Sequence, residues 1–320
     1  MSDYIRQNSV SIDYQLGDSW IILSEIEQSI KQKIESNGTP LRDWNITINR
    51  GILTGLNEAF IISKEKRDEL IASDPKSAEI IRPILRGRDI ERFHVDFQNL
   101  YLINTHNGYV SDNGTTVDAI DINKYPSVKD WLDNGAWNTK PEKGTNIERL
   151  TKRTDSGTTP YNLRSLAYMD DFSKPKIVWA ETMRIRKNKT EKFPRFSYID
   201  DPFFVDKTCF FATGEDLDYC LSILNSSVGR YQFSQIVPMM DNGGYSMQKI
   251  FIERFIIALP GSRDGQNLPT LIRKIILSED VGERAAIEDE IDNLVFAAFH
   301  FSDREKQYII RQNSMVLLDR

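Results

Sequence analysis

The sequence has few of the residues that build metal sites and disulfide frameworks. Its 320 residues include two cysteines, Cys209 and Cys220, and three histidines, His94, His106 and His300. The cysteines lack C-x-x-C or other metal-ligand spacing and the histidines are scattered, so we predict neither a metal site nor a disulfide scaffold. The two thiols are expected to be packed inside a protein of a reducing compartment.

Long apolar runs are also missing. No stretch approaches the roughly 20 apolar residues that span a bilayer, and the first ten residues, MSDYIRQNSV, contain no apolar signal core. The content of 40% hydrophobic and 28% charged residues is typical of a soluble globular protein. We therefore expect a cytoplasmic monomer, and the length suggests about two domains.

Nucleotide-binding and catalytic motifs are absent as well. The segment RGILTGLNEAF, residues 50–60, has two glycines four apart, but in a P-loop a lysine follows the second glycine, and here Leu56 does. Neither G-x-G-x-x-G nor G-x-S-x-G is present. The tetrapeptide DPFF, residues 201–204, loosely resembles the Asp/Asn-Pro-Pro-Tyr/Phe motif of amino-methyltransferases, but it lacks the second proline. We predict no catalytic centre in this chain.

Charge is unevenly distributed along the sequence. The formal net charge is −6, yet residues 140–195 contain 14 Lys/Arg and 7 Asp/Glu, a local charge of +7. The acidic total argues against a nucleic-acid partner, because domains that bind nucleic acid are usually basic. The basic stretch is either a solvated polar segment or a face directed at an anionic polymer.

Hydrophobic periodicity and turn residues predict the principal elements. A helix near residues 20–36 can begin with a capping box of Ser24 and Glu27 and end at Asn37-Gly38. A second capping pair, Ser302 and Glu305, begins a short C-terminal helix. Further helices are expected at 64–73, at 216–233 and across an apolar stripe from 287 to 299. Strands are expected at 45–48, 59–62, 99–103, 176–180, 195–199, 203–206, 209–213 and 251–259.

Two stretches, 105–116 and 133–174, lack clear periodicity. The second contains Trp137, Tyr161 and Tyr168, so we expect ordered loops, since long irregular segments in compact chains are usually functional or disordered. The predicted fold class is α+β, with mixed sheets, flanking helices, long ordered loops and a helical C-terminal segment. It lacks the regular alternation of strands and helices that a parallel sheet requires.

An ordered series of segments resembles one family. It includes LRDWNITINRGILTGLNEAFIIS, SAEIIRPILRGRDIERF, KRTDSGTTPYNLRS, LSILNSSVGRYQF and IDNLVFAAFHFSDREKQYII. Together these are similar to the C-terminal specificity region of TaqI-like adenine-N6 DNA methyltransferases, as found in single-chain type IIG restriction–modification enzymes. The resemblance covers roughly residues 20–312, and residues 51–60 and 159–164 are its most specific parts.

The resemblance implies a division of labour. In this family an upstream Rossmann-like domain binds S-adenosylmethionine and methylates adenine at N6, and a nuclease domain can precede it. This chain lacks those motifs, so the resemblance implies no cofactor here and no methylation by this chain alone. The implied partners are double-stranded DNA and an adenine methyltransferase domain, in the same parent chain or as a separate subunit. Residues 1–215 would form the α+β target-recognition region, and residues 216–320 a helix-rich part that completes it.

Arginine, lysine and amide side chains supply the contacts that such a region needs for phosphates and base edges. In residues 50–60 we expect Gly51 and Gly55 to allow a tight connection between strands, and a purely structural hairpin remains an equal alternative. A solvated turn remains an alternative for residues 184–189. The predicted DNA-binding residues are Arg50, Thr54, Asn57, Arg153, Tyr161, Asn162, Arg164, Arg184, Arg186, Lys187 and Lys189.

Two other functions remain open at this stage. The chain could be a protein–protein scaffold that docks the methyltransferase domain without reading sequence. It could also be a small-molecule enzyme with an unrecognised site, although no acid–base or metal constellation supports that reading.

Overall fold

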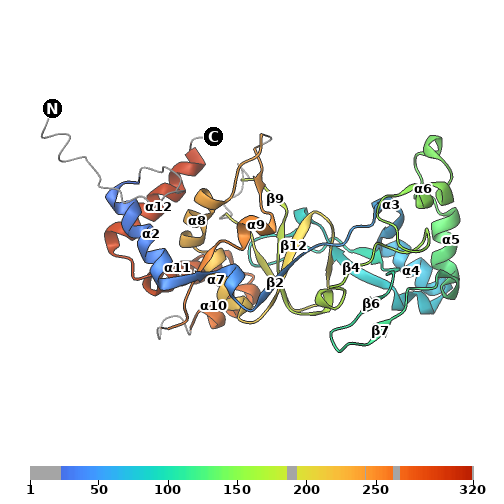
Figure 1. Cartoon of the computed structure of the whole chain (residues 1–320), viewed down its shortest axis with the longest axis horizontal. Coiled ribbons are helices and arrows are strands. Elements are labelled where there is room, and N and C mark those ends of the chain that lie inside the picture. Colours follow the sequence, from blue (N-terminus) through green and yellow to red (C-terminus); the bar gives the residue numbers. More distant parts are fainter. Residues whose placement is uncertain (1–22, 186–192, 242, 262–266, 319–320) are drawn as a thin grey trace, which may run out of the picture.

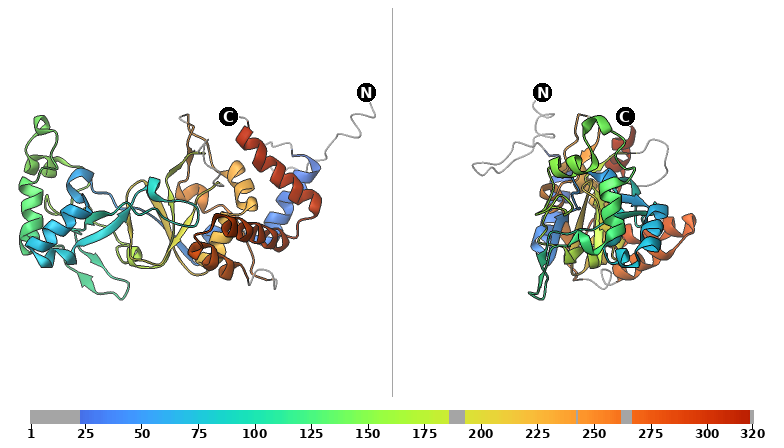
Figure 2. Two further views of the ribbon diagram at one scale, coloured as in Figure 1. Left: turned by 180° about the vertical axis from the view of Figure 1, so that it is seen from behind. Right: turned by 90° about the vertical axis from the view of Figure 1, so that its right-hand side faces the viewer.

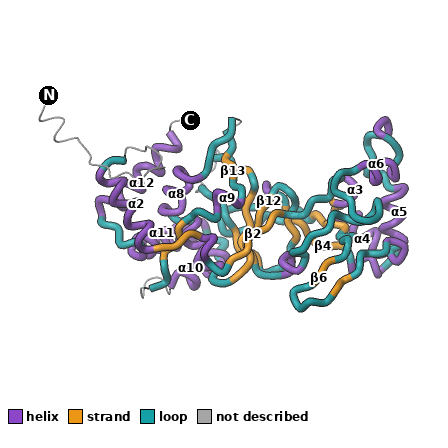
Figure 3. The backbone as a smooth tube through the Cα atoms, in the orientation of Figure 1, coloured by secondary structure: helices purple, strands orange, loops and turns teal. Residues whose placement is uncertain are grey.

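The computed structural model describes residues 23–185, 193–241, 243–261 and 267–318. The described chain is elongated (Figure 1). Helices gather at its two ends, and strands occupy much of the middle (Figure 3). We call the end formed by the described residues of 23–45 and 215–318 the helical lobe, and the end formed by residues 51–172 together with 203–206 the distal lobe. A four-stranded sheet lies between them.

The helical lobe contains seven of the described helices and one small sheet. The Glu27 carboxylate accepts hydrogen bonds from the backbone N–H and the hydroxyl of Ser24, both at 2.7 Å, so the predicted capping box is confirmed. The antiparallel pair β1 (Gly38–Pro40) and β14 (Ile256–Ala258) joins this lobe's two sequence segments. The helices are α2 (Glu25–Asn37), α7 (Leu217–Leu224), α8 (Ser227–Ile236), α9 (Lys249–Ile252), α10 (Leu268–Leu277), α11 (Val281–Ala298) and α12 (Asp303–Leu318).

The helix predicted at 216–233 is two helices. The Ser226 hydroxyl accepts a hydrogen bond from the Gly229 N–H at 3.0 Å, which caps α8, and α7 ends one residue before Asn225. Serine competes for backbone donors and therefore favours a new helix start over a helix interior. The short helix predicted after Ser302 extends over 16 residues as α12.

The distal lobe combines four helices with a mixed sheet. Its helices are α3 (Asn57–Phe60), α4 (Lys64–Ser73), α5 (Pro126–Asn134) and α6 (Asn146–Lys152). The sheet order is β11-β4-β5-β3, from Phe204–Val205, Ile81–Leu85, Leu100–Ile103 and Ile61–Ser63. The β11–β4 pair is parallel, and the others are antiparallel. A hairpin of β6 (Tyr109–Val110) and β7 (Thr116–Val117) lies in the stretch predicted as a loop.

The central sheet has the order β10-β8-β12-β2 and is antiparallel throughout. Its strands are β10 (Ser197–Ile199), β8 (Lys176–Ala180), β12 (Cys209–Gly214) and β2 (Ile46–Arg50). Beside it, β9 (Thr182–Met183) pairs with β13 (Tyr245–Ser246). All five residues of β8 are buried, so both faces of this strand are covered.

Alternate residues of the central strands belong to two hydrophobic cores. Trp179 and Phe210 pack in the core of the helical lobe, whereas Val178 and Phe211 pack in the core of the distal lobe. This follows from the two-residue period of a strand, which points successive side chains to opposite faces. The central sheet is therefore a wall shared by both lobes.

The α+β class, the mixed sheets, the flanking helices and the helical C-terminal segment are confirmed. The helical lobe's core unites Ile30 and Ile48 with residues beyond 176, so its members come from both sides of residue 215. The division into 1–215 and 216–320 stays a prediction. Among the described helices, none has the length and apolar character needed to cross a bilayer.

Candidate nucleic-acid interface

The connection after β2 explains the two glycines of residues 50–60. A Cβ on Gly51 would lie 1.9 Å from the carbonyl oxygen of Asp206, and Gly55 has φ +68°. The Gly51 N–H donates to the Cys209 carbonyl at 2.9 Å. Gly51 thus lets two backbones approach closely, and Gly55 supplies a left-handed turn that other residues adopt with strain. The predicted tight turn is present at Gly55, but the segment leads into α3 (Asn57–Phe60), and β2 and β3 belong to different sheets, so it is neither a direct connection between strands nor a hairpin.

Arg50 ends β2 and lies at the surface. Its Nη2 donates to both carboxylate oxygens of Glu181 at 2.8 Å, and its Nε donates to the Lys207 carbonyl at 3.2 Å. The side chain remains 42% exposed. Arg50 is therefore accessible, but Glu181 occupies the donors that would meet a phosphate.

Thr54 and Asn57 are bonded to each other. The Thr54 hydroxyl donates to Asn57 Oδ1 at 2.5 Å and accepts the Leu56 N–H at 3.2 Å. Thr54 is 1% exposed, so its hydroxyl holds the turn before α3 and faces no solvent. Asn57 is half-buried.

Arg153 is buried and holds the irregular loop together. Its guanidinium donates to the carbonyls of Thr54 at 2.6 Å, Asp155 at 2.9 Å and Pro160 at 3.2 Å, and also to that of Asn162. It lies over the Phe60 ring, 4.5 Å from the centroid. Burial lowers the pKa of Arg153 to about 10. In this conformation the side chain serves the fold.

The segment Tyr161–Arg164 divides into internal and exposed side chains. Asn162 is 1% exposed, and its amide donates to the carbonyls of His106 at 3.3 Å and Ile120 at 2.9 Å. The Tyr161 hydroxyl donates to Asp133 at 2.8 Å. Arg164 is 58% exposed, with Asp155 at 3.6 Å.

A basic hollow of about 540 Å³ lies beside the central sheet. We call it the arginine hollow. Its lining residues come from the end of β8, from β9, from the β11–β12 turn and from the 3-10 helix Gly87–Asp89. They include four arginines, Arg86, Arg88, Arg184 and Arg195. Arginine side chains converging from separate segments can bind an anion that no single segment would hold.

The arginines of the hollow differ in their partners. Arg86 donates to Asp89 through Nε at 3.0 Å and Nη2 at 2.9 Å, and the buried Arg195 donates to the Arg184 carbonyl at 3.1 Å. Arg88 and Arg184 are exposed, and neither guanidinium pairs with a carboxylate of the described residues. These two cations are therefore available to a ligand.

Gly87 and Thr208 both line the hollow and lie close together, since a Cβ on Gly87 would lie 3.0 Å from the Thr208 carbonyl oxygen. The Gly87 N–H donates to the Thr208 hydroxyl at 2.9 Å, and Thr208 in turn donates to the buried Asp206 carboxylate. Burial raises the pKa of Asp206, against the hydrogen bonds from Thr208 that lower it. The turn that carries Asp206 and Thr208 thus fixes Gly87, and with it the two arginines on either side.

Sequence reasoning named Arg184 but missed Arg86 and Arg88. The available signal was the R-G-R pattern of residues 86–88 directly after the apolar strand β4. The predicted residues Arg186, Lys187 and Lys189 lie outside the described residues. The DNA-contact role of each predicted residue stays a prediction.

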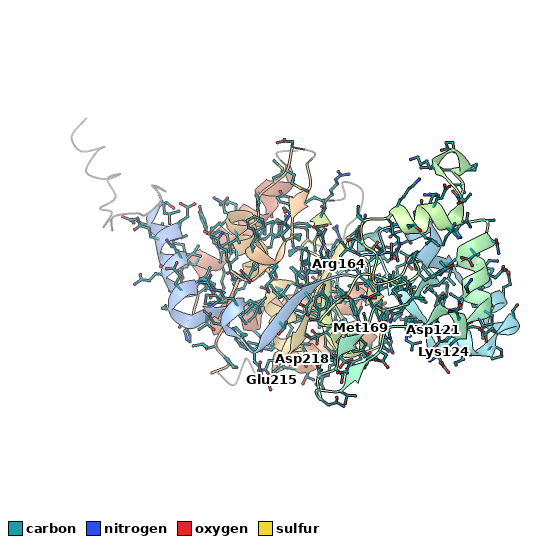
Figure 4. The ribbon with its side chains drawn as sticks, turned by 45° about the vertical axis from the view of Figure 1, so that its right-hand side comes forward. Asp121, Lys124, Arg164, Met169, Glu215 and Asp218 are labelled. Atoms are coloured by element: carbon teal, nitrogen blue, oxygen red, sulfur yellow. The ribbon has the colours of Figure 1, made fainter. Side chains whose placement is uncertain are left out.

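Two projections rise from one edge of the molecule. The loop leading to β13 and the helix α6 point the same way in Figure 1 and in the view from behind in Figure 2, with the central strands between them. Figure 4 shows Arg164 near the middle of the molecule, whereas Glu215 and Asp218 lie at the lower edge. Within the described residues, no cluster of three or more His, Cys, Asp or Glu could hold a metal ion.

Comparison with known proteins identifies the fold in larger enzymes. The sequence matches no protein-family model and no curated protein. The structure is similar to part of the type IIL restriction–modification enzyme MmeI, solved in complex with DNA, with a TM-score of 0.54 and 10% identity over 88% of this chain and 37% of that one. The type IIG restriction endonuclease BpuSI aligns with a TM-score of 0.47 and 16% identity over 85% of this chain and 33% of its own.

The chain spans about a third of the length of each of these enzymes. Its architecture is thus one that occurs in part of a restriction–modification enzyme. The finer likeness to the specificity region of TaqI-like methyltransferases stays a prediction from the sequence.

Proposed function

We propose that this chain is the DNA recognition part of a type II, IIG-like restriction–modification enzyme that methylates adenine at N6. It binds duplex DNA and presents the target to a catalytic domain outside this sequence, which would bind the S-adenosylmethionine. The arginine hollow carries the proposal, because it offers two exposed guanidinium groups that have no carboxylate partner among the described residues. The likeness in fold to an enzyme solved with DNA supports it.

Each part of the interface has a distinct task in this proposal. Arg88 and Arg184 bind phosphates in the hollow, since guanidinium groups match phosphate geometry with two parallel hydrogen bonds. Arg164, which is exposed, extends the contact toward the distal lobe. Arg50 is exposed as well, but it can join the contact only when Glu181 releases its guanidinium. Thr54, Arg153 and Asn162 act indirectly, because their polar groups are used within the fold. Arg186, Lys187 and Lys189 remain candidates for phosphate or base contacts.

The test is selection of bound duplexes from a random-sequence pool, at low and at physiological salt. Enrichment of one short motif supports autonomous target recognition. The double variant Arg88→Ala, Arg184→Ala should then bind all sequences more weakly. The negative slope of log K against log salt should become shallower by about 1.8, since each lost phosphate contact removes about 0.9 from its magnitude. Lys124→Ala changes an exposed cation of the distal lobe and should leave affinity and slope unchanged.

A second candidate is a docking scaffold for the methyltransferase domain without sequence readout. Leu277 at the end of α10 and Val281 at the start of α11 are 82% and 78% exposed, and large exposed apolar side chains are common at protein interfaces. This candidate predicts binding to the catalytic domain that Leu277→Ser and Val281→Ser weaken. Salt-insensitive behaviour and no enriched motif in the selection would favour it over DNA recognition.

A further inference from the structure

A lysine-rich projection stands in the distal lobe, apart from the arginine hollow. It consists of residues 138–152, which form the loop before α6 and the helix α6 itself, and we call it the α6 projection. It contains four Lys/Arg and two Asp/Glu, a local charge of +2. It shares no residue with the lining of the arginine hollow, and the sequence analysis selected none of its residues for DNA binding.

Three lysines of the α6 projection face solvent without partners. Lys140, Lys143 and Lys152 are exposed, and none of them forms an ion pair with a carboxylate of the described residues. The neighbouring Glu148 carboxylate is already used, because it accepts the Thr145 N–H at 2.7 Å and the Thr145 hydroxyl at 3.1 Å. Even exposed ion pairs contribute little to stability, so the fold does not depend on these three lysines.

The inner side chains of the α6 projection anchor it to the lobe. The Arg149 guanidinium donates to Glu58 Oε1 and to Asn138 Oδ1, both at 2.7 Å. It also lies over the Trp137 ring, 5.4 Å from the centroid, and Leu150 is fully buried. The cation that serves the fold is therefore Arg149, and the three lysines stand on a support that a ligand does not have to order.

The opposite edge of the distal lobe is acidic. Residues 105–121 contain three aspartates and no lysine or arginine. The β6–β7 hairpin of this segment points away from α6 in Figure 1 and in the view from behind in Figure 2. A polyanion is attracted to one edge of the lobe and repelled by the other, because charges of one sign gather on each.

Exposed cations also occur elsewhere along the edge from which α6 rises. Thr182 lines the arginine hollow and pairs with Ser246 of β13, so the hollow lies at the base of the loop that leads to β13. Arg164, which is 58% exposed, lies near the middle of the molecule (Figure 4). The helix α6 lies at the distal end (Figure 1). An extended polyanion along this edge meets cations at three places.

We propose that the α6 projection is a second phosphate-binding surface for duplex DNA, which lies along this edge and contacts both lobes. The inference rests on the proposed function and extends it to residues outside the arginine hollow. Lys140, Lys143 and Lys152 bind the DNA backbone and read no bases, because an ammonium group is a point charge without the fork geometry of arginine. The occupant is a duplex because the basic groups continue from the projection to the hollow.

The test is a filter-binding titration of the whole chain with a duplex of about 30 base pairs, roughly three helical turns, at several salt concentrations. The triple variant Lys140→Ala, Lys143→Ala, Lys152→Ala should bind all sequences more weakly. The negative slope of log K against log salt should become shallower by about 2.7, because each lost phosphate contact removes about 0.9 from its magnitude. The melting temperature should stay the same, since exposed side chains without partners are changed.

Two control variants separate location from charge. Replacing the same three lysines by arginine keeps the charge and should keep the slope. The triple variant Lys31→Ala, Lys76→Ala, Lys124→Ala removes three exposed lysines from other elements and should leave affinity and slope unchanged. Equal losses in the two alanine variants would overturn the assignment to the α6 projection.

Combination with the hollow variant tests whether the two surfaces are separate. The lysine-to-alanine changes joined to Arg88→Ala, Arg184→Ala should change the slope by the sum of the two separate changes, because distant contacts are additive. A combined change no larger than that of one variant would mean that both surfaces bind the same phosphates, and it would overturn the second contact.

The remaining outcomes distinguish this inference from the proposed function. If the unchanged chain binds duplexes and the lysine-to-alanine variant keeps its affinity and slope, the α6 projection does not bind DNA, while the proposed function stands. If that variant instead loses binding to the methyltransferase domain, the projection meets an acidic protein surface and the inference is wrong. If the unchanged chain binds no duplex at low salt, both the inference and the proposed function fail.

Discussion

Arg153 shows that a basic side chain in an irregular loop can be committed to the fold. The Arg153→Met variant would leave the carbonyls of Thr54, Asp155, Pro160 and Asn162 without their shared donor. Hydrogen bonds to a charged group contribute about 1.5–3 kcal/mol each and do not add fully. We expect a loss of about 3 kcal/mol in the free energy of unfolding, measured by urea denaturation.

Arg164 provides the matched control for that measurement. It lies in the same loop but is 58% exposed. Arg164→Met should therefore change the free energy of unfolding by less than about 0.5 kcal/mol. Similar losses in both variants would contradict the structural role assigned to Arg153.

Lys176 gives a pH-dependent prediction. It is 0% exposed, its Nζ donates to the Asp201 carbonyl at 3.2 Å, and burial lowers its pKa to about 8 from 10.5. Between these two values the unfolded chain binds more protons than the folded one, so this residue makes stability rise with pH. Below pH 8 its contribution is flat.

The measurement compares the unchanged chain with Lys176→Met from pH 7 to pH 10, so that other titrating groups cancel. At pH 7 the variant should be the more stable, because a buried ammonium is costly. Its advantage should shrink above pH 8 by about 1.4 kcal/mol per pH unit. A constant difference would mean that the Lys176 ammonium is not desolvated.

Glu181 gives a prediction about binding. Its carboxylate accepts hydrogen bonds from the Arg50 guanidinium and lines the arginine hollow. If the hollow binds DNA, Glu181→Gln should tighten binding to all duplexes alike, because it releases Arg50 and removes a repulsive charge. The salt slope should steepen by about 0.9 for the added phosphate contact. An unchanged affinity in filter-binding titrations would count against DNA at this place.

At the scale of elements, the connection after β2 depends on a close approach of two backbones. Gly51→Ala places a Cβ 1.9 Å from the Asp206 carbonyl, so we expect a loss of about 3 kcal/mol or more, in the range of severe packing errors. Gly261→Ala is the control, since its Cβ meets only the Leu259 carbonyl at 4.0 Å. Near-equal urea midpoints for the two variants would show that β2 and the β11–β12 turn can separate at little cost.

Elements with strong local signals were predictable from the sequence. The helix at Lys64–Ser73 and the strand at Lys176–Ala180 have the predicted bounds. Weak signals were missed: α5 buries only Val128 and Leu132, and the strands of the β6–β7 hairpin have two residues each. The hairpin strands are too short to repeat a pattern. The helix Lys64–Ser73 buries only Leu70, and its end was marked by Asp74-Pro75.

The candidate site was predictable in residue type but not in exposure. Arg153 and Arg184 look alike in sequence, yet one is buried and the other is exposed. The difference depends on long-range contacts: Arg153 binds the carbonyl of Thr54, 99 positions away. The arginine hollow likewise joins segments near residues 87, 182 and 208. Sequence alone could name candidates but could not bring them together.

At the scale of the whole molecule, the central sheet couples the two lobes. Phe210 and Phe211 are neighbours in β12, but they belong to the cores of the helical and the distal lobe respectively. If one lobe unfolded together with the sheet, the apolar residues in the core of the other lobe would be exposed to water. We therefore expect one cooperative unfolding transition for the described molecule, although its shape is extended.

The test uses Phe210→Leu and Phe211→Leu, which trim each core from the same strand. Because the sheet is shared, each change should shift the transition of both lobes together. Trp137 reports on the distal core and Trp179 on the core of the helical lobe. The measurement uses variants that keep only Trp137 or only Trp179 of these two reporters. The urea midpoint reported by Trp137 should equal that reported by Trp179, both without and with each phenylalanine substitution. If Phe211→Leu moved the Trp137 midpoint and left that of Trp179 in place, the lobes would unfold independently, and the sheet would join them without coupling their stability.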